Sequence, residues 1–518
     1  MLYVACSTKC TASGRISESN SYRKLLDCHA SGYLVERLLV EDAMSDICLV
    51  RREPNKGYYG RWLWLPKRLI NVKAVKRGLE FPTVTADGLE YLQLWKENET
   101  HLITPREYIS RKNYYKLPFP IINVGPRTFR KVDFKSRIIL DLKEPTRATQ
   151  TSAFRAMLAS GGGLLNLACG KGKTVIALQH IATRKVPALV VVNNTTLIKQ
   201  WKERIDEFLE VPGGVGFAQG PPSEWDWEGR GIVIGMIHSL ALRYDQLPDG
   251  FSRYFGGVYY DEVHHLSAPL FIRTAPLFYG ERHGLTATIS REDGLEAIYL
   301  YHIGDAYFKD LSQDLRPKIY FQICPIRLHT QDRAVREAIT DGKGRLNIPK
   351  LRTYLGTLEE CNNFIADRLK PPLEIGRKIL VLSHSVEQLR RLHSMFSESG
   401  LCIGSEKPEA RMETLKTKRI IFGTMQLVRE ALDEASLDTL YILTPFGRAD
   451  IERGGVNTLQ QAMGRILRHR PGKQEPVVVI FDYIFIPKLH RMCSTLKWRL
   501  ETWPDDQGGP MEYSVLQP

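Results

Sequence analysis

The stretch LLNLACGKGKTVIALQH, residues 164–180, joins a short apolar run to a glycine turn and then to residues with helical spacing. This order predicts a buried strand, a loop and a helix. Glycine has no Cβ, so the backbone N–H groups near Gly170 and Gly172 can point at phosphate oxygens, as can the helix N-terminus. The stretch therefore predicts a phosphate-binding loop, although Leu167 stands where the pattern G-x-x-x-x-G-K-[ST] begins with glycine.

Two side chains after the turn suit a nucleotide. Lys173 directly precedes Thr174, so its ammonium can reach the β- and γ-phosphates while the Thr174 hydroxyl can bind Mg²⁺. Lys171 lies within the loop and is expected to face solvent. Taken alone, the motif leaves a chance glycine-rich turn as the alternative.

A second motif, GGVYYDEVHHL at residues 256–266, ends an apolar run with two adjacent carboxylates. Asp261 is expected to hold Mg²⁺ directly or through water, and Glu262 is expected to polarise the water that attacks the γ-phosphate. An acidic turn after a strand is common, but this one follows Lys173 after two further strand candidates. Together the two motifs predict an NTPase that uses Mg²⁺.

The pattern of apolar and polar residues from residue 139 onward is that of an α/β protein. Apolar runs such as ALVVV (188–192) alternate with amphipathic segments such as LIKQWKERIDEFL (197–209), a pattern typical of parallel sheets covered on both faces. A second series of the same kind begins near residue 378. We therefore expect two α/β lobes at 139–310 and 311–490, a linker or helical insertion near 327–375, and a frayed tail at 491–518.

The first 138 residues read as a small α+β module with a basic surface. Residues 1–140 contain 24 Lys and Arg against 14 Asp and Glu, which accounts for ten of the fourteen net positive charges of the 518-residue chain. Lysines and arginines interleave with aromatic residues in KGYYGRWLWLPKR (56–68) and RKNYYKLPF (111–119). Such residues suit nucleic-acid contact, though they equally suit core strands and a solubilising surface.

The composition argues against a membrane protein, a secreted protein and a disulfide-rich protein. No run approaches the ~20 apolar residues of a membrane span, and the N-terminus lacks a secretory pattern, so we expect a cytoplasmic protein without membrane partners. Nine scattered cysteines fit a reducing compartment. A zinc cluster of Cys6, Cys10, Cys28 and His29 is an alternative that the C-x₃-C spacing does not favour.

The motifs, taken in order, resemble those of superfamily 2 DExH helicases over residues 145–485. DEVHHL resembles motif II, and GLTATISREDG (284–294) is similar to motif III followed by the Arg-Glu-Asp triplet of the XPB branch. NNTTLIKQW (193–201) is similar to motif Ia, and IVIGMIHSL (232–240) to the strand after it. KILVLSHSVEQ (378–388), IIFGTMQLVREALD (420–433) and QAMGRILR (461–468) resemble motifs IV, V and VI. The basic N-terminal module looks most like that of phage branch-migration helicases of the UvsW kind.

This resemblance implies two RecA-like lobes and a set of residue roles. In the first lobe, phosphate and Mg²⁺ would be bound by Gly170, Gly172, Lys173 and Thr174, metal and water by Asp261 and Glu262, and adenine by Gln150, while coupling would involve His264, Thr286 and Thr288. In the second lobe, the residues that would reach the γ-phosphate are Gln461, Arg465 and Arg468, and the ribose would be contacted by Asp433. The nucleic-acid backbone would be contacted by Thr195, Thr288, Ser383 and Thr424. The sequence around Gln150 departs from the family pattern. So do Ala431, where glycine is usual, and Met236, where a phosphate-binding threonine is common.

The predicted function is an ATP-dependent DNA helicase or translocase that acts as a monomer on single-stranded, forked or branched DNA in a bacterial or phage-infected cell. Three alternatives stay open. The chain could unwind RNA, it could be a nucleic-acid-binding scaffold that ATP only switches, or it could be the motor of a restriction complex. Glu262, Arg465 and Arg468 argue against the scaffold, because a switch does not require water activation.

Overall fold

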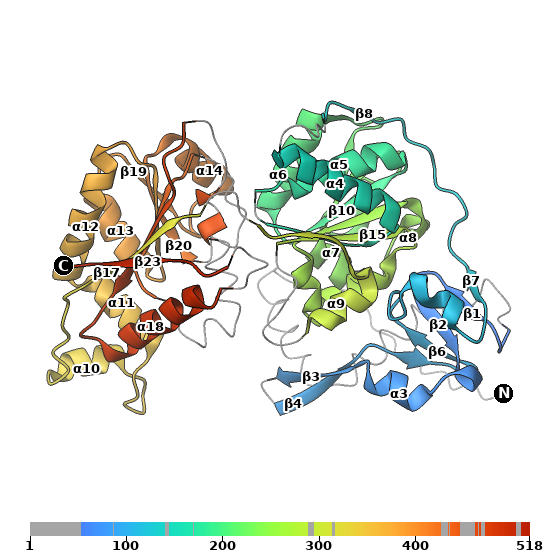
Figure 1. Ribbon diagram of the computed structural model, residues 1–518, viewed down its shortest axis with the longest axis horizontal. Coiled ribbons are helices and arrows are strands. Elements are labelled where there is room, and N and C mark those ends of the chain that lie inside the picture. The colour runs from blue at the N-terminus through green and yellow to red at the C-terminus, as the bar shows by residue number, and fades with distance from the viewer. Residues whose placement is uncertain are drawn as a thin grey trace, which may run out of the picture.

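The computed structural model describes two lobes and a smaller N-terminal module (Figure 1). The described residues are 53–85, 88–139, 145–168, 170–287, 295–312, 316–425, 434, 436–445, 462–464, 466–467, 472–503 and 509–518. The four residues of the zinc alternative, Cys6, Cys10, Cys28 and His29, lie outside these ranges.

The first lobe is built on a seven-stranded sheet in which every neighbouring pair is parallel. In spatial order the strands are β12 (Val215–Ala218), β13 (Ile232–Met236), β10 (Ala188–Val192), β14 (Gly257–Asp261), β15 (Glu281–Thr286), β9 (Gly163–Leu167) and β16 (Ala306–Asp310). The runs GLLNL and ALVVV are buried throughout, as expected for strands with helices on both faces.

Helices cover both faces of this sheet, so alternate residues of one strand enter different cores. Leu165 packs with α4 (Pro145–Ser160), α5 (Lys173–Arg184) and α6 (Thr195–Phe208), whereas Leu164 packs on the opposite face. The helices of that opposite face are α7 (Ile237–Leu242), α8 (Phe251–Tyr254), η5 (Val263–Ser267), η6 (Phe271–Leu277) and α9 (Glu296–Ile303). A short η4 (Pro222–Glu224) and a two-residue pair of β8 (Lys135–Ser136) with β11 (Leu209–Glu210) complete the lobe.

The second lobe repeats this plan with another all-parallel sheet of seven strands. Its strands, in spatial order, are β19 (Ser399–Cys402), β20 (Ile420–Thr424), β18 (Ile379–Ser383), β21 (Thr439–Ile442), β22 (Val477–Asp482), β17 (Lys318–Ile323) and β23 (Tyr513–Leu516). Its helices are α10 (Arg333–Ile339), α11 (Ile348–Thr357), α12 (Glu359–Glu374), α13 (Val386–Ser394), α14 (Pro408–Thr417) and α18 (Pro487–Glu501). The predicted fold class, two RecA-like parallel-sheet lobes in tandem, is confirmed.

Of the linker or helical insertion expected near 327–375, the structure shows helices, and α11 and α12 bury Leu351, Leu355 and Ile365 in the core of the lobe. The described residues of the C-terminal segment, 491–503 and 509–518, do not form the frayed tail that was expected. α18 packs into the other core, and β23 is the edge strand that pairs in parallel with β17. The pairing of β23 with β17 is made through backbone atoms, so the amino-acid composition of this segment does not reveal it.

The N-terminal module is a small mixed sheet with a separate hairpin. The sheet order is β5 (Lys96–Glu97), β6 (His101–Thr104), β2 (Leu63–Pro66), β1 (Gly57–Tyr59) and β7 (Ile121–Asn123). The other elements are η2 (Lys67–Leu69), α3 (Val72–Arg77), the hairpin β3 (Glu80–Thr85) and β4 (Gly88–Gln93), and η3 (Arg111–Lys116).

The two aromatic-basic segments of this module have different environments. Tyr58, Trp62 and Trp64 of the first are buried and form the core of the small sheet. In the second, Tyr115 on η3 is 81% exposed, and Lys116 Nζ lies 5.5 Å from the centre of its ring. Only this second segment leaves an aromatic ring of the kind that could stack on a base.

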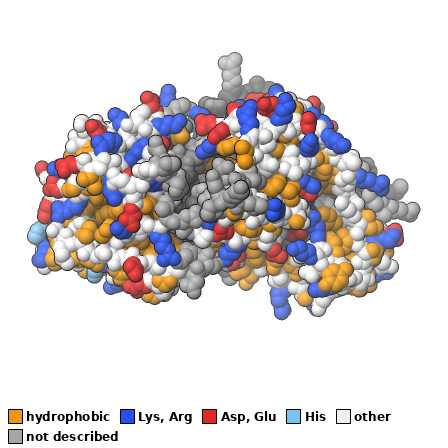
Figure 2. All heavy atoms as spheres, turned by 45° about the horizontal axis from the view of Figure 1, so that its top comes forward, with side chains coloured by type: hydrophobic (Ala, Val, Ile, Leu, Met, Phe, Trp, Pro, Cys, Tyr) orange, Lys and Arg blue, Asp and Glu red, His pale blue; other side chains and the backbone are white. Residues whose placement is uncertain are grey.

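Charge on the surface is mixed in sign. On the face drawn in Figure 2, Lys and Arg side chains alternate with Asp and Glu over both lobes. Among the described residues, none of the helices combines the length and the hydropathy that crossing a bilayer requires.

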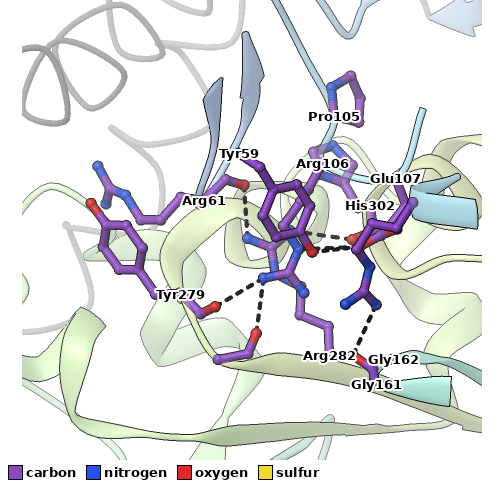
Figure 3. Close-up of polar contacts among 12 residues, drawn as sticks. Tyr59, Arg61, Pro105, Arg106, Glu107, Gly161, Gly162, Tyr279, Arg282 and His302 are labelled. Carbon is purple, nitrogen blue, oxygen red and sulfur yellow. Dashed lines mark hydrogen bonds and ion pairs between the residues drawn. The ribbon is translucent and has the colours of Figure 1, made fainter. Parts of the chain in front are cut away.

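Buried arginines join the N-terminal module to the first lobe (Figure 3). Arg106 Nη1 donates hydrogen bonds to the carbonyl oxygens of Tyr279, at 3.1 Å, and Gly280, at 2.8 Å. In the opposite direction, Arg282 Nη2 donates to the carbonyl oxygen of Arg61 at 2.8 Å. Both arginines are at most 1% exposed, so the module and the lobe each bind backbone of the other through a buried guanidinium group.

This contact explains part of the basic excess. Burial and the neighbouring charge of Arg106 lower the pKa of Arg282 to about 9, which still leaves it charged at neutral pH. The carboxylate of Glu107 lies 3.5 Å from Arg106 Nε and 3.4 Å from Arg111 Nε, while Arg111 Nη2 donates to the carbonyl oxygen of Gly161 at 2.9 Å. Arg106 and Arg111, which belong to the N-terminal module, therefore contribute positive charge that binds the first lobe.

Replacing Arg106 by methionine tests the contact, because it keeps an unbranched side chain and removes both hydrogen bonds. The change leaves two buried carbonyls unpaired and should cost about 3–5 kcal/mol in the free energy of unfolding of the module and first lobe. Urea denaturation followed by limited proteolysis measures this loss. The matched control is Arg130→Met, since Arg130 donates to the carbonyls of Gly229 and Arg230 from an exposed position and should cost under about 1 kcal/mol. Equal losses in the two variants would contradict this account.

Candidate nucleotide-binding site

The loop between β9 and α5 has the geometry of a phosphate cradle. Gly170 and Gly172 have φ values of 85° and 81°, which L side chains rarely adopt. A Cβ on Gly172 would lie 2.4 Å from Nε2 of Gln150, so a larger residue would displace the end of this side chain as well as strain the backbone. No side chain caps the first turn of α5, and this turn contains no acidic residue. Its N–H groups and positive dipole end therefore suit an anion.

The two loop lysines have different partners, and one expectation was wrong. Lys173 Nζ donates to the carbonyl oxygen of Leu167 at 3.0 Å, so its ammonium lies across the loop. Lys171 does not face solvent. It is 8% exposed, and its Nζ lies 2.8 Å from Asp310 Oδ2 and 2.7 Å from Ser312 Oγ. Lys171 therefore ties the loop to the end of β16 and leaves the phosphate-facing position to Lys173.

Strand register sets the distance between the loop and the carboxylates. Asp261 is level with Leu285 on β15, and Leu285 is level with Leu165 on β9. Two strand spacings separate Asp261 from Leu165, about 10 Å. The carboxyl ends of these parallel strands share one sheet edge, so Asp261 lies across from the loop at a distance that suits a triphosphate and its metal.

Asp261 is held by a residue that the sequence analysis missed. Trp201, buried on α6, donates its indole N–H to Asp261 Oδ2 at 2.8 Å. Burial and the adjacent charge of Glu262 raise the pKa of Asp261 to about 6, against the opposing effects of Trp201 and the positive charge of Lys173. A carboxylate whose charge is costly in this way gains most from a cation beside it.

Glu262 follows in a strained conformation. Its φ and ψ are 46° and 55°, the left-handed region that residues other than glycine seldom occupy. The Oδ1 atom of Asp261 accepts the Glu262 N–H at 3.0 Å, which helps to hold this turn. Strain of this kind costs on the order of 1–3 kcal/mol and is typical of functional turns. Glu262 Oε2 also lies 3.4 Å from Nδ1 of His264, the predicted coupling residue.

The coupling strand β15 places Thr286 beside the loop strand. Thr286 is buried and is the register partner of Asn166 on β9. The Asn166 side chain is 1% exposed, and among the described residues neither its amide nitrogen nor its amide oxygen has a hydrogen-bond partner. Thr288 lies outside the described residues.

The residues predicted to contact nucleic acid vary in exposure. Thr195 is exposed at the start of α6, and Thr424 is half-buried at the end of β20. Ser383 is the register partner of Thr424, so both lie at the carboxyl edge of the second sheet. However, Ser383 is 1% exposed and its hydroxyl donates to Gln388 Oε1 at 2.7 Å. This internal bond counts against a direct contact from Ser383.

Several predicted residues cannot be placed, and their roles stay predictions. Gln461, Arg465, Arg468 and Asp433 lie outside the described residues, as does Ala431. Gln150 is half-buried and donates from Nε2 to the carbonyl oxygen of Lys171 at 3.3 Å. It therefore contacts the phosphate loop itself, and an adenine contact would use its amide oxygen or its second N–H.

The residues present fit ATP with Mg²⁺. Gly172, Lys173 and the first turn of α5 would hold the phosphates, and the half-buried Thr174 with Asp261 would hold the metal. These are oxygen ligands, which Mg²⁺ prefers.

Replacing Trp201 by phenylalanine should impair ATP hydrolysis while keeping the aromatic packing. A hydrogen bond to a charged group contributes about 1.5–3 kcal/mol, so kcat/KM should fall about tenfold to a hundredfold. Steady-state ATPase kinetics measure the change. The control is Trp225→Phe, because buried Trp225 donates its indole N–H to the carbonyl oxygen of Gly220 away from the carboxylates. Wild-type kinetics in Trp201→Phe, or an equal loss in both variants, would contradict the role of Trp201.

Comparison with known proteins agrees with this geometry. A family model described as the type III restriction enzyme res subunit matches residues 143–291, which contain both motifs of the first lobe. A protein of Acanthamoeba polyphaga mimivirus, provisionally named an ATP-dependent RNA helicase, is 25% identical over 72% of this chain and 71% of its own length. A DNA 3′-5′ translocase named XPB2 from Sulfurisphaera tokodaii is 32% identical, over 39% of this chain and 40% of its own length.

A solved structure supports the fold alone. A point variant of S. cerevisiae Dbp5, bound to RNA and ADP BeF₃, aligns with a TM-score of 0.50 at 12% identity and covers 71% of this chain and 89% of its own. The likeness shows a fold of two RecA-like lobes in tandem. The family match over the first lobe and the sequence relatives show that this chain is similar to proteins named as helicases and translocases.

Proposed function

We propose that this protein is an ATP-dependent helicase or translocase that moves on DNA and separates or remodels forked or branched strands. The observation that carries the proposal is the joint placement of the loop at Lys173 and the carboxylates Asp261 and Glu262 on one sheet edge, in the first of two RecA-like lobes. A single lobe would suffice to bind a nucleotide. A second RecA-like lobe supports coupling of hydrolysis to movement.

In this proposal each residue of the first lobe has one task. The ammonium of Lys173 neutralises charge on the β- and γ-phosphates, and Glu262 accepts a proton from the attacking water. Mg²⁺, when bound, would bridge phosphate oxygens and offset their charge. Trp201 holds Asp261 in the orientation that a metal requires.

The second lobe would complete the site. Arginines reaching a transferring phosphoryl group are worth roughly 10³–10⁵ in rate, and the proposal assigns this role to Arg465 and Arg468, aided by Gln461. Because water activation and these arginines belong to different lobes, hydrolysis would require the lobes to close. A strand bound to both lobes, at Thr195 and Thr424, would then advance with each cycle of closing and opening.

The N-terminal module would supply additional grip on DNA, within the proposed division into 1–138, 139–310, 311–490 and 491–518. Exposed Lys112, Tyr115 and Lys116 on η3 support this role better than the buried aromatic residues of β1 and β2 do. We propose more specifically that the protein acts as a monomer in the cytoplasm of a bacterial or phage-infected cell. Its activity there would be branch migration.

An RNA helicase is the second candidate, and the mimivirus relative favours it because its match covers most of both chains. The sequence similarity to a DNA translocase is higher over a shorter segment, and the basic module suits duplex DNA, so we retain DNA as the first choice. An ATP-switched scaffold is the third candidate. It would bind ATP without turnover, and the strained Glu262 beside Asp261 argues against it.

Lys173→Ala and Glu262→Gln test the site in the full chain. ATP turnover should be stimulated by nucleic acid in the wild type and be absent in both variants, because one loses phosphate binding and the other loses water activation. The assay compares ATPase rate and strand separation on single-stranded DNA, duplex, fork, four-way junction and RNA. Lys202→Ala is the control, since Lys202 pairs only with Asp206 on the exposed side of α6 among the described residues. Normal turnover in both site variants would remove the assignment, and stimulation by RNA alone would favour the second candidate.

Tyr115→Ala combined with Lys116→Glu tests the proposed grip. Loss of a stacking ring and reversal of one charge should weaken DNA binding at least tenfold and reduce its salt dependence. Fluorescence anisotropy across a salt titration measures both effects. Tyr91→Ala is the matched control, because Tyr91 on β4 is 61% exposed in the same module. Unchanged affinity at every salt concentration would show that η3 does not bind DNA.

A further inference from the structure

A cluster of metal-ligating side chains lies within the first lobe, apart from the nucleotide site. His180 on α5 and Glu281 and His283 on β15 bring one ligand atom each within 4.8 Å of one another. Glu281 is the first residue of β15, so the cluster lies toward the amino end of this strand, whereas the nucleotide loop lies at the carboxyl edge. None of the three is among the residues assigned to bind phosphate, Mg²⁺ or water at the nucleotide site.

The secondary structure explains why the three residues meet. Residues two apart on a strand share a face, so Glu281 and His283 point the same way while Arg282 between them points to the N-terminal module. Residues four apart on a helix also share a face, so His180 and Arg184 of α5 lie over this pair. The rings of His180 and His283 lie 4.7 Å apart, and Arg184 binds Glu281 Oε1.

The two imidazoles are buried, and some of their nitrogen atoms have no partner among the residues that the structure describes. His180 is 1% exposed and His283 is fully buried, and within this part of the chain His180 Nε2 and both ring nitrogens of His283 lack a hydrogen bond. Glu281 Oε2 lies 3.6 Å from His283 Nε2. Buried polar atoms without partners are rare in folded proteins, and a bound ion is one established reason for them.

The surroundings of the cluster suit metal ligation. Tyr259 OH lies 2.8 Å from His180 Nδ1, so when Nδ1 carries the proton the lone pair of Nε2 faces the cluster. Arg184 occupies one oxygen of Glu281 and leaves the other, Oε2, directed at His283. Metal-binding histidines and carboxylates are typically oriented by such outer hydrogen bonds.

We propose that His180, Glu281 and His283 form a binding site for a divalent transition metal, best matched by Zn²⁺. Two imidazoles and one carboxylate are a common zinc ligand set, whereas Mg²⁺ and Ca²⁺ prefer oxygen ligands throughout. Tetrahedral zinc needs ligand atoms about 3.3 Å apart, so small rotations of the side chains would close the site. A water molecule would take the fourth position.

The metal would brace two elements that serve the nucleotide site. α5 begins with Lys173, and β15 ends with Thr286, so a bond between them fixes the helix of the phosphate loop against the coupling strand. Glu281 is the least buried of the three ligands, with 23% of its side chain exposed, and provides the route of entry.

The test uses the full chain, stripped with a chelator and free of histidine tags. Competition with a chromophoric chelator should show one tightly bound Zn²⁺ per chain, and Co²⁺ should give the intense visible bands of a tetrahedral site without thiolate charge transfer. His283→Gln and Glu281→Gln should each weaken Zn²⁺ binding at least about a hundredfold, since each removes a ligand. Zn²⁺ should also raise the Tm of the wild type and not of these variants.

Three controls separate this site from others. His302→Gln removes another buried histidine with an unpartnered Nδ1, near the N-terminal module, and should leave binding unchanged. Asp261→Asn should also leave it unchanged, because it affects only the Mg²⁺ site. Loss of the signal in Cys10→Ser, together with thiolate bands, would assign the metal to the N-terminal cysteines and overturn the proposal.

The wild type alone can decide the question if a variant does not fold. Absence of stoichiometric Zn²⁺ binding by the wild type would overturn the proposal, as would binding that both ligand variants retain. None of these outcomes depends on ATP hydrolysis, so the proposal can fail while the proposed function stands.

Discussion

The nucleotide site depends on one constraint, the alignment of the carboxyl ends of the parallel strands β14, β15 and β9. Asp261, Leu285 and Leu165 form a row across β14, β15 and β9, so the loop and the carboxylates are separated by one intervening strand. A shift of one residue in either pairing would turn every side chain to the opposite face. The position of Asp261 relative to Lys173 is therefore a property of the whole sheet, and the two core clusters on its faces maintain it.

The same lobe buries charged and polar groups at three places, and each serves a different purpose. Asp261 has a carboxylate whose charge burial disfavours, which prepares it for a cation. Arg106 and Arg282 are buried with backbone carbonyls as partners and dock the N-terminal module. His180 and His283 are buried without such partners, which is why we assign a metal to them. In each case the identity of the partner separates a structural role from a chemical one.

The fold and the core of the site could be predicted from the sequence because they depend on local patterns. Uninterrupted apolar runs indicated buried parallel strands, and the spacing of Gly172, Lys173 and Thr174 indicated the loop. Contacts between distant residues could not be predicted in this way. The amphipathic pattern of α6 shows that Trp201 is buried, but nothing in it shows that the indole meets Asp261 sixty positions later.

The number and sign of the charged residues were the least reliable basis for predicting where those residues lie and what they bind. Lys171 was expected to face solvent because lysine usually does, yet Asp310 and Ser312 draw it inward. The basic excess of the first 140 residues suggested a polyanion, although Arg106 and Arg111 bind the first lobe. The edge strand β23 was missed because its residues pair with β17 through backbone atoms, and amino-acid composition does not indicate such pairing. A count of charges cannot tell a partner within the chain from one outside it.

The central claim is that a triphosphate held by the first lobe is hydrolysed only when arginines of the second lobe reach it. Arg465→Ala in the full chain tests this claim directly, with ATP affinity measured by equilibrium binding and hydrolysis by single turnover in the presence of DNA. The account predicts nearly unchanged ATP affinity and a hydrolysis rate lower by about 10³-fold or more. Hydrolysis at the wild-type rate in this variant would contradict it.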